Sequence, residues 1–86
     1  MFDTLTIRTD RRFTQRGLRE RMARLERGAP GVLRAKGILR GITGSLNVQY
    51  VPGDLKITGC DLAGNTLNII GKDLDKPALA RLFDGE

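Results

Sequence analysis

The stretch VLRAKGILRG, residues 32–41, holds the side chains whose types and spacing best suit binding to an anion. Arg34, Lys36 and Arg40 are separated by even numbers of residues, so an extended strand places all three on one face. Such a face can contact the phosphates of a nucleic acid or the surface of another protein domain. It can equally be a solvated outer face. These three residues are our candidate interaction face.

Closely spaced glycines raise the separate question of a phosphate-binding loop. The segment GILRGITG, residues 37–44, lacks the Gly-Lys-Ser/Thr ending of a P-loop, and no helical pattern follows it. The segment IIGKD, residues 69–73, leads from a strand toward a helix but has no upstream glycine. We interpret both segments as turns or strand ends, and we expect no cofactor in this chain.

The remaining reactive residue types do not form a catalytic or metal-binding set. The sequence has no histidine and a single cysteine, Cys60, so it lacks the commonest zinc ligand and cannot form an internal disulfide. Cys60 has no adjacent cation to activate its thiol. Capping explains the aspartates at predicted turns and helix starts, which are Asp54, Asp61, Asp73 and Asp75. We therefore predict that the chain is not an enzyme, with no catalytic residue and no metal site.

The positive charge is concentrated in the first half of the chain. Residues 1–40 hold eleven basic and four acidic residues, whereas residues 41–86 hold four basic and six acidic ones. This asymmetry suits an acidic partner, or an arginine-rich helix that faces water. Proteins that bind single-stranded nucleic acid usually place aromatic side chains among the cations. The aromatic residues here are scattered: Phe2, Phe13, Tyr50 and Phe83.

The length of 86 residues allows one small domain, which we expect to span residues 1–86. The apolar runs are far shorter than the ~20 residues that span a bilayer, and the chain does not open with a secretory signal. We therefore expect no membrane association and a cytoplasmic location.

Hydrophobic periodicity predicts strands and helices in the order β-α-β-β-β-β-α. Alternation predicts strands over residues 2–9, 32–41, 45–51, 54–60 and 66–71, with a Pro52-Gly53 turn inside a hairpin. Short connections between the later strands favour an antiparallel sheet. The predicted fold class is α+β, with two layers, a mainly antiparallel sheet of about five strands, and helices on one face.

Two amphipathic helices should cover this sheet. The first begins after an N-cap at Thr14, and Glu20 is well spaced to pair with Arg24. Its inward stripe is Leu18, Met22, Leu25 and Ala29, and the arginines outside this stripe are Arg16, Arg19, Arg21, Arg24 and Arg27. The second helix is capped by Asp73 or Asp75. It should pack inward through Leu79, Leu82 and Phe83.

Within the strand over residues 32–41, alternation divides the side chains between two faces. The face expected in the core is Leu33, Ala35, Gly37 and Leu39. Glycine weakens a strand interior, so Gly37 should mark a bulge or the close approach of a helix.

Three segments of the chain resemble the C-terminal domain of the CobW-type (CobW, HypB and UreG-related) P-loop GTPases. RRFTQRGL resembles the family's turn after the first strand, LRAKGIL resembles its most recognisable strand, and IIGKDLDKPAL resembles its last strand and final helix. The likeness extends from about Phe2 to Phe83. The chain departs from the family at Arg40-Gly41, where an aromatic residue is usual, and it lacks the histidine-rich tail of some members.

The resemblance implies a place in a larger protein. Family members are regarded as GTP-dependent metallochaperones or metal-enzyme activators linked to cobalamin, zinc or nitrile hydratase metal supply. GTP, a divalent metal and a Cys-x-Cys-Cys motif belong to their N-terminal GTPase domain, so this chain would be excised from a longer protein or be a stand-alone relative. It would act as a non-catalytic accessory domain that contacts the GTPase domain or a client metalloprotein. The alternative is a small basic nucleic-acid-binding domain.

Overall fold

The alternating segments of the sequence form one sheet in the structure, a computed structural model that describes residues 1–84. In chain order the elements are β1 (Asp3–Arg8), β2 (Arg12–Phe13), α1 (Gln15–Gly28), β3 (Val32–Gly41), β4 (Ser45–Val51), β5 (Asp54–Cys60), β6 (Thr66–Gly71) and α2 (Lys76–Asp84). The predicted class and order are confirmed, and the two-residue β2 is an addition that sequence periodicity missed. Neither helix of residues 1–84 is long and apolar enough to cross a membrane.

The last strand of the chain lies between the first and the third. The spatial order is β1-β6-β3-β4-β5, and β6 pairs antiparallel with both β1 and β3. Consecutive hairpins join β3, β4 and β5, while β2 pairs in parallel with the end of β3. Gly53 has a φ of 85°, as the predicted type II turn between β4 and β5 requires.

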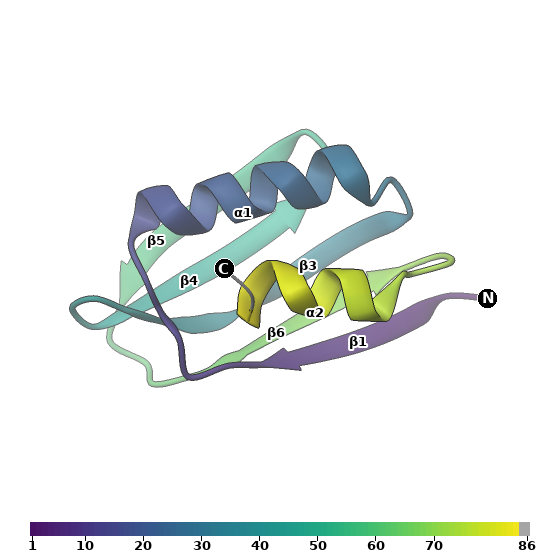
Figure 1. The fold of residues 1–86 in the computed structure, drawn as a ribbon. Coiled ribbons are helices and arrows are strands. Elements are labelled where there is room, and N and C mark those ends of the chain that lie inside the picture. Colours follow the sequence, from purple (N-terminus) through teal and green to yellow (C-terminus); the bar gives the residue numbers. More distant parts are fainter. Residues whose placement is uncertain (85–86) are drawn as a thin grey trace.

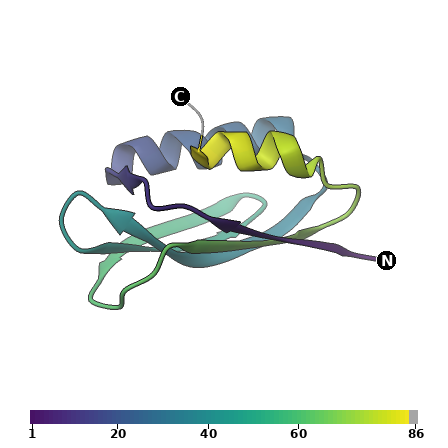
Figure 2. The ribbon, with the colours of Figure 1, turned by 60° about the horizontal axis from the view of Figure 1, so that its bottom comes forward.

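Both helices lie on the same face of the sheet (Figure 1). Helix α1 contacts β3 and β5, α2 contacts β1, and the helices contact each other. Figure 2 shows that no helix of the described residues covers the opposite face. The two-layer prediction is therefore confirmed, and one face of the sheet is left uncovered by secondary structure.

The helices fill the space above the sheet with the predicted apolar stripes. The buried side chains of α1 are Leu18, Met22 and Leu25, and those of α2 are Leu79 and Phe83. Both helix starts are capped, because the side chains of Thr14 and Asp75 accept hydrogen bonds from the backbone N–H groups of Gly17 (2.9 Å) and Ala78 (3.2 Å).

Two details of α1 differ from the prediction. Glu20 forms its ion pair with Arg16, at 3.8 Å, rather than with Arg24. Arg21 does not belong to the outer face: it is half-buried, its guanidinium lies 5.4 Å from the centre of the Phe13 ring, and it donates a hydrogen bond to the Leu82 carbonyl. Arg21 therefore joins α1 to α2 and to β2.

The start of β3 reverses the predicted faces. Val32 is buried and Leu33 is 43% exposed, whereas alternation placed Leu33 in the core. The pairing of β3 with β6 shifts register between Val32 and Arg34, which marks a bulge. Because a bulge adds one unpaired residue, side chains before it exchange faces. Beyond the bulge the prediction holds, since Ala35 and Leu39 are fully buried.

Gly37 is required by a neighbouring strand and not by a helix. A Cβ atom on Gly37 would lie 2.1 Å from the carbonyl oxygen of Thr66 and 2.8 Å from the Cα of Leu67, both in β6. These are backbone atoms of β6, which is paired with a strand on each side and cannot move aside independently. The expectation that a helix closely approaches this glycine is therefore wrong.

We predict that Gly37→Ala destabilises the fold by about 1–3 kcal/mol, the usual cost of forcing extra atoms into a packed site. The measurement is urea-induced unfolding followed by circular dichroism. Gly59→Ala in β5 is the matched control, because a Cβ there meets nothing within 4 Å, and it should change the unfolding free energy by less than about 1 kcal/mol. Equal stability of the two variants would contradict this account.

Candidate interaction surface

The helix-free side of the sheet, which we call the open face, is formed by alternate residues of five strands. Its residues are Thr4, Thr6 and Arg8 (β1), Thr66, Asn68 and Ile70 (β6), Arg34, Lys36, Ile38 and Arg40 (β3), Asn47, Gln49 and Val51 (β4), and Asp54, Lys56 and Thr58 (β5). Among them stand five cations and one acid, Asp54. The open face is therefore polar and positively charged.

One row of residues crosses the whole sheet in register. From β1 to β5 it reads Thr6, Asn68, Lys36, Gln49 and Lys56. Thr6 donates a hydrogen bond to the side-chain oxygen of Asn68, at 2.8 Å, so this end of the row is internally bonded. Lys36 and Lys56 flank Gln49 at the other end. Lys36 of β3 and Lys56 of β5 are therefore two strand spacings apart, about 10 Å.

A shallow hollow of about 250 Å³ lies over β3, β4 and β5 at this end of the row. The charged residues that line it are Arg34, Lys36, Lys56 and Asp54, and Gln49 lies among them. Within residues 1–84, no ion pair involves Arg34, Lys36 or Lys56. The hollow therefore carries a net positive charge that the described part of the chain does not neutralise.

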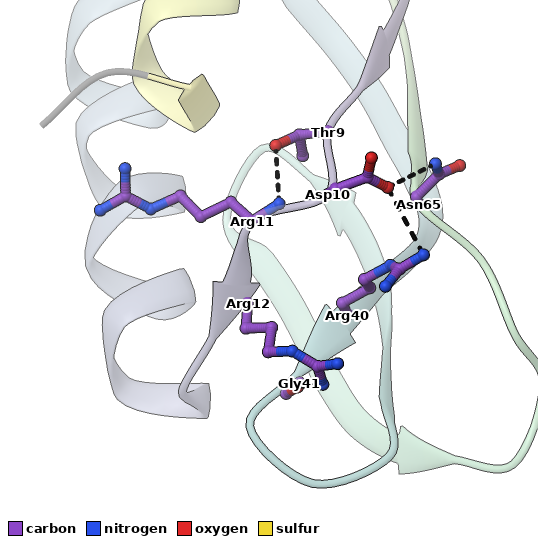
Figure 3. A network of polar contacts seen from close by, with 7 residues as sticks. All are labelled: Thr9, Asp10, Arg11, Arg12, Arg40, Gly41 and Asn65. Atoms are coloured by element: carbon purple, nitrogen blue, oxygen red, sulfur yellow. Dashed lines mark hydrogen bonds and ion pairs between the residues drawn. The ribbon is translucent and has the colours of Figure 1, made fainter.

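Arg40 is separated from the other two candidate residues. It lies four residues from Lys36 along β3, about 13 Å, and its guanidinium forms an ion pair of 3.5 Å with Asp10. Asp10 also accepts a hydrogen bond of 3.1 Å from the Asn65 amide (Figure 3). This network ties the end of β3 to the loops before β2 and β6, so Arg40 has a structural role there.

The side chain of Arg12 forms a further contact with the end of β3. It donates a hydrogen bond of 3.3 Å to the carbonyl oxygen of Gly41, close to the Asp10 network in Figure 3. Arg12 lies beside Arg40 in the parallel pairing of β2 with β3. The short β2 therefore anchors the chain before α1 to the end of the sheet.

The open face has no aromatic side chain on which a base could stack. Tyr50, Phe13 and Phe83 are buried on the helix side, and Phe2 precedes the first strand. Residues 1–84 also contain no group of three or more His, Cys, Asp or Glu side chains that could hold a metal ion. This surface therefore offers mainly charge and hydrogen bonding, and Val51 and Ile70 are its exposed apolar side chains.

Sequence reasoning placed Arg34, Lys36 and Arg40 on one face correctly, but it missed Gln49 and Lys56. Both residues alternate with apolar neighbours in their own strands, which was the available signal. What the sequence did not show is that β4 and β5 follow β3 in space and bring these residues into register with Lys36.

The hairpin that carries Gln49 and Lys56 is held by one glutamate of α1. Glu26 accepts a hydrogen bond of 2.7 Å from the backbone N–H of Gly53 in the β4–β5 turn. Burial raises the pKa of the Tyr50 hydroxyl, and the negative charge of Glu26 and a hydrogen bond with it raise that pKa further. Glu26 thus fixes the tip of the hairpin beneath the helix.

The fold places the chain among small two-layer α+β domains that have helices on one face of an antiparallel sheet. Its family follows from the similarity of its sequence to known proteins. The chain matches the family model described as the cobalamin synthesis protein CobW C-terminal domain over residues 2–85. The chain belongs to this family, as its strand and helix motifs predicted. A comparison with curated proteins finds no match.

Two solved structures share the fold. They are the Zn(II)-bound YjiA GTPase from E. coli and a Zn(II)-bound triple mutant of that GTPase, with TM-scores of 0.79 and 0.80. Each is 21% identical to this chain and matches 98% of it. The chain spans 29% of the length of each of those proteins.

The contact of Glu26 with Tyr50 predicts a distinctive titration. Glu26→Gln should lower the pKa of Tyr50 toward its ordinary value of 10.0 but leave it above that value, because burial, the largest cause, remains. Ultraviolet absorbance measures this directly, since the chain has one tyrosine and no tryptophan. Glu20→Gln removes the same charge elsewhere on α1 and should leave the titration unchanged. Equal shifts in both variants would contradict the contact.

The raised pKa of Tyr50 also determines the direction in which the stability of the fold changes with pH. The folded state favours the neutral hydroxyl of Tyr50, so this contribution to stability is complete below pH 10.0 and is lost as the pH rises through the folded-state pKa.

Proposed function

We propose that this chain is the non-catalytic accessory domain of a CobW-type GTP-dependent metallochaperone. Membership of the CobW C-terminal domain family supports this proposal, as does the fold that it shares with part of a GTPase. In this proposal, GTP and a divalent metal are bound by an N-terminal GTPase domain and not by this chain. The protein would work in the cytoplasm.

The observation that carries the proposal is the uncovered positive face of the sheet. The open face concentrates cations, and three of them, Arg34, Lys36 and Lys56, form no ion pair within residues 1–84. Arg34 and Lys36 are the residues to which we assign contact with the GTPase domain or with a client metalloprotein. Arg40 is a weaker candidate because Asp10 already binds it.

Charge reversal tests this assignment. Arg34→Glu combined with Lys36→Glu should weaken association with the GTPase domain by about tenfold or more, because two attractive charges become repulsive. The measurement is isothermal titration calorimetry with the GTPase domain encoded upstream of residue 1, where the proposal requires a P-loop and a Cys-x-Cys-Cys motif. Circular dichroism checks that the variant is folded.

The matched control is Arg19→Glu combined with Arg27→Glu. Both arginines are exposed on α1, in the other layer of the molecule, so this variant changes the net charge equally without altering the open face. Its affinity should stay close to that of the unmodified chain. If the open-face variant binds the GTPase domain as tightly as the unmodified chain, Arg34 and Lys36 do not lie in the interface.

Nucleic-acid binding is the alternative that the positive charge keeps open, and a salt titration tests it. Phosphate contacts release counterions, so nucleic-acid affinity falls steeply with the logarithm of salt concentration. We expect no detectable binding of single-stranded RNA or duplex DNA at ~50 mM salt, measured by fluorescence anisotropy. Tight binding with a steep salt slope would replace the accessory-domain proposal with the nucleic-acid function.

A further inference from the structure

We propose that the hollow over β3, β4 and β5 is a carboxylate-binding site that takes an extended acidic segment of a protein partner. The inference rests on the proposed function, because it names the chemistry that the open face would recognise. Its core is the in-register set Lys36, Gln49 and Lys56, with Arg34 beside it.

The first argument is the arrangement of donors around one position. Lys36 and Lys56 stand on either side of Gln49, and all three line the same hollow of about 250 Å³. An ammonium group offers three N–H donors and the glutamine amide offers two. A carboxylate placed above Gln49 can therefore accept charge-assisted hydrogen bonds from more than one side chain.

The second argument is the lack of an internal counter-charge. Arg34 and Lys36 are two residues apart on one face of β3, and Lys56 lies two strand spacings from Lys36, so these like charges repel one another unless an anion lies among them. Elsewhere in the described residues, Arg40 pairs with Asp10 and Arg16 pairs with Glu20. The hollow has one acid, Asp54, at the first position of β5, and it forms no ion pair with the cations around it within residues 1–84. An anion from outside the domain would fill this role.

The third argument selects an acidic polypeptide over a nucleic acid. Tyr50 contributes to the lining of the hollow, but it is only 4% exposed and is buried on the helix side, so no aromatic ring on the open face could stack with a base. In an extended segment, side chains two residues apart point the same way and lie about 7 Å apart. A segment that crosses β4 with acids at alternate positions can therefore offer one carboxylate to Lys36 and another to Lys56.

The test uses a short synthetic peptide in which Glu alternates with Ser, with fluorescence anisotropy as the readout. The peptide should bind the chain, and the same peptide with Gln in place of Glu should not. Lys56→Gln should weaken binding by about threefold to fivefold, the amount that one exposed ion pair can supply. Arg8→Gln is the matched control, because Arg8 lies on the open face at the far edge of the sheet and does not line the hollow.

Three outcomes would overturn the site. They are equal losses for Lys56→Gln and Arg8→Gln, binding of the Gln peptide as tightly as the Glu peptide, and tighter binding of single-stranded RNA than of the acidic peptide. The test is separate from that of the proposed function. If the GTPase domain binds through Arg34 and Lys36 while the acidic peptide does not bind, the carboxylate site fails and the accessory role stands. If the peptide binds but the GTPase domain does not associate with the chain, the accessory role fails and the carboxylate site stands.

Discussion

Burial of both helices against one face of the sheet is the constraint on which the rest of this domain depends. The stripe of α1 and the inward side of α2 together cover the alternate apolar residues of the strands, which leaves the other set of alternate residues in contact with water. Because side chains alternate between the two faces along the regular part of each strand, polar and charged residues at every second position stay outside the core. The same burial that stabilises the domain thus produces its basic open face.

The position of β6 between β1 and β3 connects this constraint to the surface. By pairing with both β1 and β3, β6 removes two free strand edges and sets the register of the residues that cross the sheet. The absence of a side chain at Gly37 lets β6 approach β3 closely, and the bulge before Arg34 sets the face on which the following residues lie. Backbone geometry at these two places therefore decides where Arg34 and Lys36 stand relative to Gln49 and Lys56.

Much of this fold could be predicted because its elements carry strong local patterns. Leu18, Met22 and Leu25 repeat with the helical period, and the β4 and β5 segments alternate around a Pro-Gly turn, so the helix and the hairpin were placed closely. The failures have local causes that periodicity does not record. Leu33 was put in the core because a bulge cannot be seen in an alternating run, and β2 is too short to show a period. Arg21 was put on the outer face because its partners, Phe13 of β2 and the Leu82 carbonyl of α2, belong to other elements and do not show in the helical pattern.

The sequence by itself determined the two-layer class, the family and the shared face of Arg34, Lys36 and Arg40, since each depends on residue order within one strand or one motif. Tertiary structure alone decided which of these cations remain available to contact a partner. Arg40 is bound by Asp10 from a loop some thirty residues earlier, whereas Lys36 is joined by Lys56 from a strand that reaches it only through β4. The physical reason is that strand order and register bring distant residues together, and pairing between strands leaves little trace in the local pattern of either one.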